Sequence, residues 1–170
     1  MGHLFRMLNF SKFLKEKKQK YIFVVNNNEN LKSILVSNSV SFQAVDFKDL
    51  KSNWEKKIIL RFKINYWVND RLDTNKQHAF NICETGVKLI TLDDYGDGAK
   101  LSDLSIYGLP KKRSFKGKKI ITGLNYLILN NDIDIYKLHR TKLEKILVTL
   151  GGSDTHGVTI KILKILKKHF

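Results

Sequence analysis

Residues 87–98 read VKLITLDDYGDG, and this stretch decides the fold class of the chain. Its first six residues are an apolar run with β-branched side chains, which predicts a buried strand over 87–92. Acidic and glycine residues follow directly and end the strand. A helix is predicted just before it, over 74–84, with Gly86 as its C-terminal stop. Another strand, ending at 65–70, precedes that helix, so the three elements form a strand–helix–strand unit.

The same alternation extends along the rest of the first 106 residues. We predict helices over 4–18, 30–36 and 49–57, and strands over 21–25, 40–45 and 104–106. Short strands alternating with helices of about ten residues favour an α/β protein with a parallel, doubly wound, Rossmann-like sheet. In such sheets, ligands bind beyond the carboxyl ends of the strands.

The last third of the chain is organised differently. A basic loop over 110–119, an apolar stretch over 126–129 and a polar connector over 130–145 precede a new unit. That unit is predicted to have a strand over 146–150, a glycine turn and a helix to the C-terminus. We therefore assign residues 1–140 to a Rossmann-like domain, and residues 141–170 to a connector and the first strand–helix unit of a second domain.

Composition narrows the classes of protein. The chain has 170 residues, 42% of them hydrophobic, which favours a packed core over disorder. The formal charge of +15 comes mostly from lysines, which we interpret as solvated surface residues, since no nucleic-acid recognition motif accompanies them. We expect no nucleic-acid partner.

No apolar run of about 20 residues and no secretory signal is found, so we expect no membrane span and a cytoplasmic location. The single cysteine, Cys83, excludes an internal disulfide and a cysteine metal cluster.

Polar spots at helix starts and strand ends are the candidate sites. They are Gly2-His3, residues 69–74, residues 93–99 and residues 151–154. Backbone N–H groups in a glycine turn can bind a phosphate, but such turns are also common structural features. The acidic run at 93–99 can equally be a turn and a helix cap. On its own, His3 can be a flexible terminal residue.

Taken in order, these spots resemble the motifs of a known family. The segments are Met1–Arg6 (tail of G-M-G-H-x-x-R), Asn69–Thr74, Leu92–Asp103 (E/D-D-x-G-x-G-A-x-x-A-D), Gly123–Leu129 (G-x-x-Y-x-x-L), and Leu147–Asp154 with Thr159 (V-x-x-G-G-S-D-x-x-x-x-T). The family is that of the UDP-sugar hydrolase of pseudaminic acid biosynthesis and the related spore-coat polysaccharide proteins. It is similar to the glycosyltransferases with two facing Rossmann-like domains, the GT-B-like fold.

The resemblance implies a reaction and a set of site residues. A UDP-activated amino-sugar loses UDP when water attacks its anomeric carbon, with inversion and without a metal or other cofactor. His3 corresponds to the base that orients the water, and Tyr95 to a second catalytic residue. The implied substrate-binding residues are Gly2, Arg6, Asp70, Asp94, Gly151, Gly152, Ser153 and Asp154. His3 and the glycine turn are expected to face one sugar diphosphate across a cleft.

The chain also departs from this family. The family's first strand, which precedes the G-M-G-H turn and is central in a doubly wound sheet, has no counterpart here, and the second domain has barely begun. We therefore expect a fragment that is incomplete as a catalyst, with unpaired strand edges that promote self-association or need a companion chain. A glycosyltransferase-like protein that moves the sugar to an acceptor, or a non-catalytic module of the same fold, are the alternatives.

Overall fold

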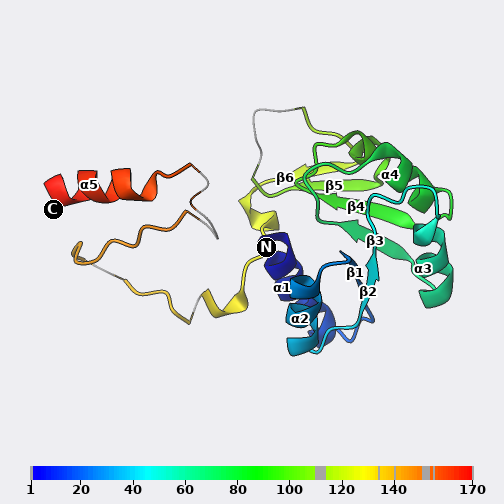
Figure 1. Cartoon of the computed structure of the whole chain (residues 1–170), viewed down its shortest axis with the longest axis horizontal. Coiled ribbons are helices and arrows are strands. Elements are labelled where there is room, and N and C mark those ends of the chain that lie inside the picture. The colour runs from blue at the N-terminus through cyan, green and yellow to red at the C-terminus, as the bar shows by residue number, and fades with distance from the viewer. Residues whose placement is uncertain are drawn as a thin grey trace. The chain divides into compact units, whose positions relative to one another are not determined.

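The computed structural model describes residues 2–109, 114–133, 135–139, 141–150, 154 and 156–169. Helices and strands alternate through much of the chain (Figure 1). The helices are α1 (Gly2–Glu16), α2 (Glu29–Ser37), α3 (Trp54–Phe62), α4 (Lys76–Cys83) and α5 (Thr159–His169). The strands are β1 (Phe23–Asn26), β2 (Phe42–Val45), β3 (Tyr66–Asn69), β4 (Lys88–Leu92), β5 (Leu104–Tyr107) and β6 (Ile120–Thr122). Short 3₁₀ helices cover Asp97–Leu101, Leu124–Tyr126 and Asn131–Ile133.

Within the described residues, the strands form two parallel sheets, one of order β1-β2 and one of order β3-β4-β5-β6. Val25 lies opposite Ala44 in the smaller sheet, and Trp67 lies opposite Leu89 in the larger one. The predicted α/β class with parallel strands is therefore confirmed, and the arrangement is compatible with a Rossmann-like fold. A single continuous sheet was expected, but no strand ladder joins the two sheets in the described part of the chain. The two-domain architecture stays a prediction.

The strand–helix–strand unit predicted from residues 65–92 is confirmed as β3, α4 and β4. The Asn75 side chain caps α4 by accepting a hydrogen bond from the Gln77 N–H at 2.7 Å. Gly86, with a φ of +80°, takes the left-handed conformation that ends this helix. The buried residues of β4 are Leu89, Thr91 and Leu92. They lie on both faces of the strand, as expected for a parallel sheet covered on both sides.

Two apolar clusters hold these elements together. The first joins α3, β3 and α4 to β4: Trp54, Ile58, Ile59, Trp67, Ala79, Ile82, Val87 and Leu89. The second joins α1, β1 and α2: Leu4, Leu8, Val25, Leu35 and Val40. Val24 packs against the first cluster, whereas its neighbours Phe23 and Val25 contribute to the second. Because successive side chains of a strand point to opposite faces, β1 contacts both clusters.

The position of α3 corrects one prediction. A helix was expected over 49–57, but α3 spans Trp54–Phe62. The Asp46 carboxylate accepts a hydrogen bond from the Lys48 N–H at 2.9 Å, and the Asp49 carboxylate accepts from the Ser52 N–H at 3.1 Å. These side chains offer the backbone turns in place of a helical ladder, so the helix starts later.

One prediction about a strand in the last third of the chain is also corrected, and one strand was not predicted. The strand expected over 146–150 is wrong, since the structure describes residues 141–150 without helix or strand. A strand needs a neighbour for its backbone hydrogen bonds, and Leu147 is 87% exposed. β6, which pairs with β5, comes directly after the basic loop and was not predicted. The apolar stretch at 126–129 contains no strand.

The described residues divide into two compact units, one up to Leu129 and one from Asn130 onward. The assignment of residues 141–170 to the start of a nucleotide-binding domain stays a prediction, as does the cytoplasmic location. Helices that combine the length and the apolar character needed to cross a bilayer are not found in the described part of the chain.

Candidate functional site

Two carboxylates mark the carboxyl edge of the larger sheet. Asp70 follows β3 directly, and Asp93 follows β4 directly. Because these strands are parallel neighbours, their carboxyl ends meet at the same edge, where ligands of open α/β sheets bind. Arg6 of α1 contacts both carboxylates, so three segments distant in the sequence meet at this edge.

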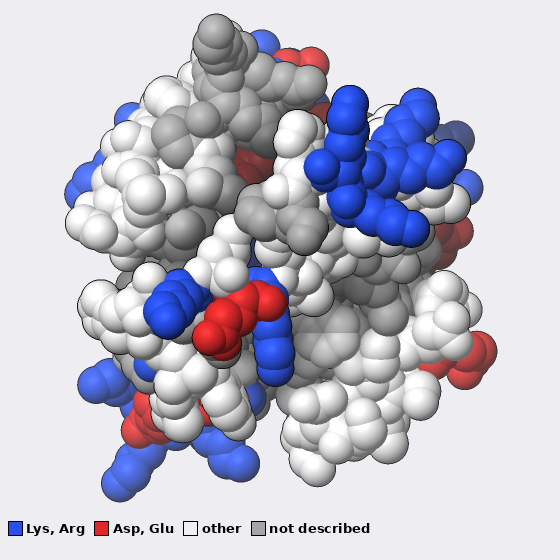
Figure 2. Space-filling model, turned by 90° about the vertical axis from the view of Figure 1, so that its left-hand side faces the viewer, with Lys and Arg blue, Asp and Glu red and all other residues white. Residues whose placement is uncertain are grey.

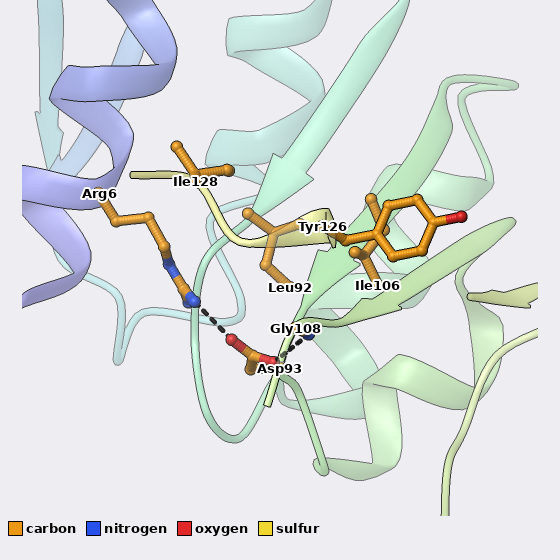
Figure 3. Close-up of a pocket in the computed structure, with 7 residues that line it drawn as sticks. All are labelled: Arg6, Leu92, Asp93, Ile106, Gly108, Tyr126 and Ile128. Atoms are coloured by element: carbon orange, nitrogen blue, oxygen red, sulfur yellow. Dashed lines mark hydrogen bonds and ion pairs between the residues drawn. The ribbon is translucent and has the colours of Figure 1, made fainter. Parts of the chain in front are cut away.

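Arg6 holds Asp70 in a two-pronged contact. Its Nε donates to Oδ2 of Asp70 at 2.8 Å, and one terminal nitrogen donates to Oδ1 of the same carboxylate. The other terminal nitrogen donates to Oδ2 of Asp93, the contact drawn in Figure 3. The hydrogen bond to Asp70 is the largest cause that raises the pKa of the Arg6 guanidinium above its ordinary value, although partial burial opposes it. Arg6 therefore carries its charge throughout the physiological pH range.

His3 completes this group. Its Nδ1 lies 2.8 Å from Oδ1 of Asp70, whose side chain is only 4% exposed, whereas the His3 side chain is 44% exposed. A carboxylate only accepts hydrogen bonds, so it selects the imidazole form with the proton on Nδ1. His3 and Arg6 are three residues apart in α1 and so lie on one face of the helix. The basic Nε2 of His3 is the nitrogen left for a ligand or water.

Asp93 is fixed from a second side. Its Oδ1 accepts a hydrogen bond from the Gly108 N–H at 2.9 Å. Its backbone has a φ of +49°, a left-handed conformation that is uncommon outside glycine and found most often at asparagine and aspartate. Beside this contact lies a small pocket (Figure 3). Its lining residues are Arg6, Leu92, Asp93, Ile106, Gly108, Tyr126 and Ile128.

A buried polar network reaches the same strand end from inside. Nδ1 of His78 lies 2.8 Å from Oε1 of Glu55, and its Nε2 lies 3.3 Å from Oδ1 of Asn69, the last residue of β3. Glu55 is completely buried and also accepts a hydrogen bond from Asn81 at 3.2 Å. Asn69, which precedes Asp70, is therefore held by His78 of α4, and Glu55 of α3 holds His78 in turn, which supports a rigid site.

The structure brings three of the predicted site residues together, namely His3, Arg6 and Asp70. Asp94 lies next to this cluster but is fully buried. Its Oδ1 accepts from the N–H groups of Thr74 at 3.0 Å and Gly96 at 2.9 Å, so it fixes two turns. Its role in substrate binding stays a prediction.

The other predicted residues of the N-terminal unit lie around the cluster. The Tyr95 ring packs against Tyr107, with centroids 5.1 Å apart, and its catalytic role stays a prediction. Gly2 is the first residue of α1, and a Cβ there would meet nothing within 4 Å. Packing alone does not require glycine at this position.

The glycine turn is not part of the described site. Gly151, Gly152 and Ser153 lie outside the described residues. The Asp154 carboxylate accepts hydrogen bonds from the N–H groups of Thr159 at 3.0 Å and Val158 at 2.9 Å. These bonds lower the pKa of Asp154. The carboxylate thus occupies the start of α5, where the predicted diphosphate contact would compete with it.

The sequence places Asp93 in the candidate segment 93–99, but the substrate contact was assigned to Asp94 and not to Asp93. The signal that could have found it is its position immediately after β4, equivalent to that of Asp70 after β3. The residue types do not determine the left-handed backbone conformation at Asp93. The Asp93 side chain contacts Arg6, whereas the Asp94 side chain contacts the backbone of two turns.

The chemistry open to the cluster is proton transfer. His3 offers a nitrogen oriented by a carboxylate, and Arg6 fixes that carboxylate in place. In the described residues, no group of three or more histidine, cysteine or acidic side chains is arranged to hold a metal ion. Comparisons with protein-family models, with curated proteins and with solved structures found no match.

Proposed function

We propose that this chain is part of a nucleotide-sugar hydrolase in which His3, oriented by Asp70, is the general base. The observation that supports the proposal is the 2.8 Å contact between Nδ1 of His3 and the nearly buried Asp70 carboxylate. It leaves Nε2 as the proton acceptor in an exposed position at the ligand-binding edge of the sheet. The motifs that resemble the UDP-sugar hydrolase family supply the substrate class, a UDP-activated amino-sugar.

The proposed reaction is a single displacement. Nε2 of His3 accepts a proton from water, and the water oxygen forms a bond to the anomeric carbon. The bond from that carbon to the diphosphate oxygen breaks, UDP leaves with the electron pair, and the sugar is released with inverted configuration. The imidazolium then returns its proton to solvent.

Asp70 and Arg6 act on this base by position and charge. Two carboxylates face one guanidinium, so the cluster carries one excess negative charge while His3 is neutral. When His3 accepts a proton during the reaction, its positive charge balances the excess negative charge of the cluster. The Asp70 carboxylate, in contact with the His3 ring, stabilises the imidazolium. Arg6 is engaged by Asp70 and Asp93, and we therefore assign it a positioning role and leave the diphosphate to other groups.

UDP release tests the proposal. The chain is mixed, in excess, with a UDP-linked diacetamido-trideoxyhexose, so that slow release is still detected in a single turnover. We expect His3→Gln to slow release by about 10²- to 10⁴-fold. The exposed His139 gives the control His139→Gln, which should leave release unchanged.

The product separates hydrolysis from the alternative reactions. Nuclear magnetic resonance of the sugar should show a free hemiacetal of inverted configuration. Release of UDP at equal rates from the wild type and His3→Gln would overturn the proposal. Sugar found only on an added acceptor would favour the transferase alternative.

A further inference from the structure

Helix α5 has two chemically distinct faces. Its sequence, TIKILKILKKH, repeats lysine at intervals of three and four residues. At about 100° per residue, the lysines gather on one side of the helix: Lys161, Lys164, Lys167 and Lys168. The opposite sector is apolar, and it contains Val158 just before the helix, Ile162, Leu163, Ile165 and Leu166. Ile160, which is 65% exposed, is the one apolar residue of this described helix among the lysines. The apolar sector is wider than the seam of a two-stranded coiled coil.

The apolar face of α5 is only partly covered in the described structure. No residue of α5 is fully buried: Leu163 and Ile165 are 50% and 59% exposed, and Ile162 and Leu166 are half-buried. Helix α4 of the other unit, which packs into a core, buries His78, Ala79, Asn81 and Ile82 in only 8 residues. The α5 sequence therefore has the amphipathic pattern of a helix that packs against a core, but none of its residues is fully buried.

The charge around α5 selects the kind of partner. No acidic residue follows Asp154 in the sequence, and Asp154 is engaged in capping the helix. None of the four α5 lysines forms an ion pair with a side chain in the described part of the chain. Figure 2 shows one group of blue Lys and Arg side chains at its upper right without red side chains among them, and blue and red side chains scattered over the rest of the view.

A second copy of α5 is a poor partner on these grounds. Two such helices joined through their apolar faces would concentrate their lysines around one short seam without carboxylates to balance them. An anionic lipid surface supplies both missing components, an apolar layer and a dense negative charge. Lysine side chains can extend along the apolar layer while their ammonium groups reach the phosphates.

We propose that α5 binds the surface of an anionic phospholipid bilayer, lying in the interface plane. Its apolar face enters the boundary between head groups and acyl chains, and its lysines contact the phosphates. Its 11 residues extend about 16 Å, about half of the hydrocarbon thickness, so the helix lies along the bilayer and does not cross it. The exposed Ile146 and Leu147 of the same unit would add to the apolar contact.

Vesicle binding by the whole chain tests this proposal. The chain is floated with vesicles of phosphatidylcholine alone and with vesicles that also contain phosphatidylglycerol. We expect binding to the anionic vesicles only, weakened by salt. Lys164→Gln with Lys168→Gln should weaken it about 25-fold, at about fivefold per lysine. The exposed Lys57 and Lys63 at α3 give the matched control, Lys57→Gln with Lys63→Gln, which should leave it unchanged.

The apolar face has its own variant and control. Ile162→Gln with Leu166→Gln keeps the charge of α5 and should abolish binding to anionic vesicles. Leu60→Gln, at a 76% exposed position of α3, should not change it. The thermal melt of each variant checks that the N-terminal unit stays folded.

Several results would overturn the proposal. No binding to anionic vesicles, equal binding to both vesicle types, or normal binding by the Ile162/Leu166 double variant would each do so. A change of oligomeric state in that variant, seen by size-exclusion chromatography without vesicle binding by the wild type, would instead assign the face to a second copy.

Discussion

Nδ1 of His3 lies 2.8 Å from Oδ1 of Asp70, although the two residues are 67 positions apart in the sequence. The contact joins the first turn of α1 to the end of β3, and it gives His3 a fixed orientation at the sheet edge. Arg6 reaches the same carboxylate from one turn further along the helix. The pair is therefore part of a larger charge cluster and not an isolated surface contact.

Asp70→Asn should disable His3 without removing it. The amide can donate a hydrogen bond to Nδ1, which would select the imidazole form with its proton on Nε2. We expect UDP release to fall by about 10²- to 10⁴-fold. Nitrogen chemical shifts of His3 should report the change of tautomer, and the thermal melt of the variant should show that the chain stays folded. The exposed Asp132 gives the control Asp132→Asn, and a variant with wild-type shifts and rates would refute the assigned role.

Two ion pairs join α3 to α4 and the residue after it, Glu55 with His78 and Lys56 with Glu84. They should contribute very differently to the free energy of unfolding. Glu55→Ala leaves His78 without its carboxylate in a fully buried site, and we expect a loss of about 3 kcal/mol in the free energy of unfolding. The exposed pair of Lys56 and Glu84 is its matched control. Glu84→Ala should cost less than about 0.5 kcal/mol. Urea denaturation measures both, and similar losses would contradict the buried network.

Gly96 and Gly2 should respond to alanine in opposite ways. A Cβ at Gly96 would lie 2.4 Å from the Thr74 backbone nitrogen, so Gly96→Ala should destabilise the fold by about 2 kcal/mol. At Gly2 the same atom meets nothing within 4 Å, and alanine favours the helix. Gly2→Ala should therefore leave the thermal midpoint unchanged or slightly higher. A lower midpoint for Gly2→Ala than for Gly96→Ala would show this packing to be wrong.

Asp103 should make stability depend on pH in the acid range. Burial raises its pKa, but the hydrogen bond from the Leu89 N–H and the Lys118 ammonium outweigh this and hold the pKa below the ordinary 3.8. The unfolded chain then binds the proton more readily, so the stabilisation is present above about pH 4 and is lost as the pH falls through the lowered pKa. Asp103→Asn should cost about 2 kcal/mol at neutral pH.

Urea midpoints measured between about pH 6 and pH 3 check this prediction. The wild type should lose stability more steeply than Asp103→Asn over that interval. Parallel curves for the two proteins would mean that Asp103 does not contribute.

The central elements could be predicted because their signals are local. β3, α4 and β4 follow from an apolar run, a capping asparagine and a stop glycine within a few residues of each other. The start of α3 could not be predicted, because it depends on competition between helical bonds and the side chains of Asp46 and Asp49. The expected strand over 146–150 shows the same limit, since a strand pattern forms a strand only when a neighbour accepts its hydrogen bonds.

The site divides in the same way. Asp70 and Arg6 were predicted from motif order. Parallel strands sharing an edge bring Asp70 and Asp93 together, whereas the contact of Arg6 with them depends on the packing of α1 through Leu4 and Leu8. The choice between Asp93 and Asp94 depends on one backbone conformation that the residue types do not determine. Glu55 and His78 look like ordinary polar residues of two helices, and only the packing of α3 against α4 makes them a buried pair.

The Arg6 contacts also have a mechanical consequence. α1 and α2 belong to the smaller apolar cluster, whereas α3 and α4 belong to the larger one. Arg6 of α1 therefore joins the smaller cluster to the sheet edge beside the larger cluster. Segments with fewer buried contacts open first under native conditions. On warming, α1 should therefore detach from the sheet edge before the elements of the larger apolar cluster unfold. UDP release should then stop at a lower temperature than the one at which the rest of the fold melts. The difference between these two temperatures should depend on how strongly the Arg6 guanidinium binds the two carboxylates.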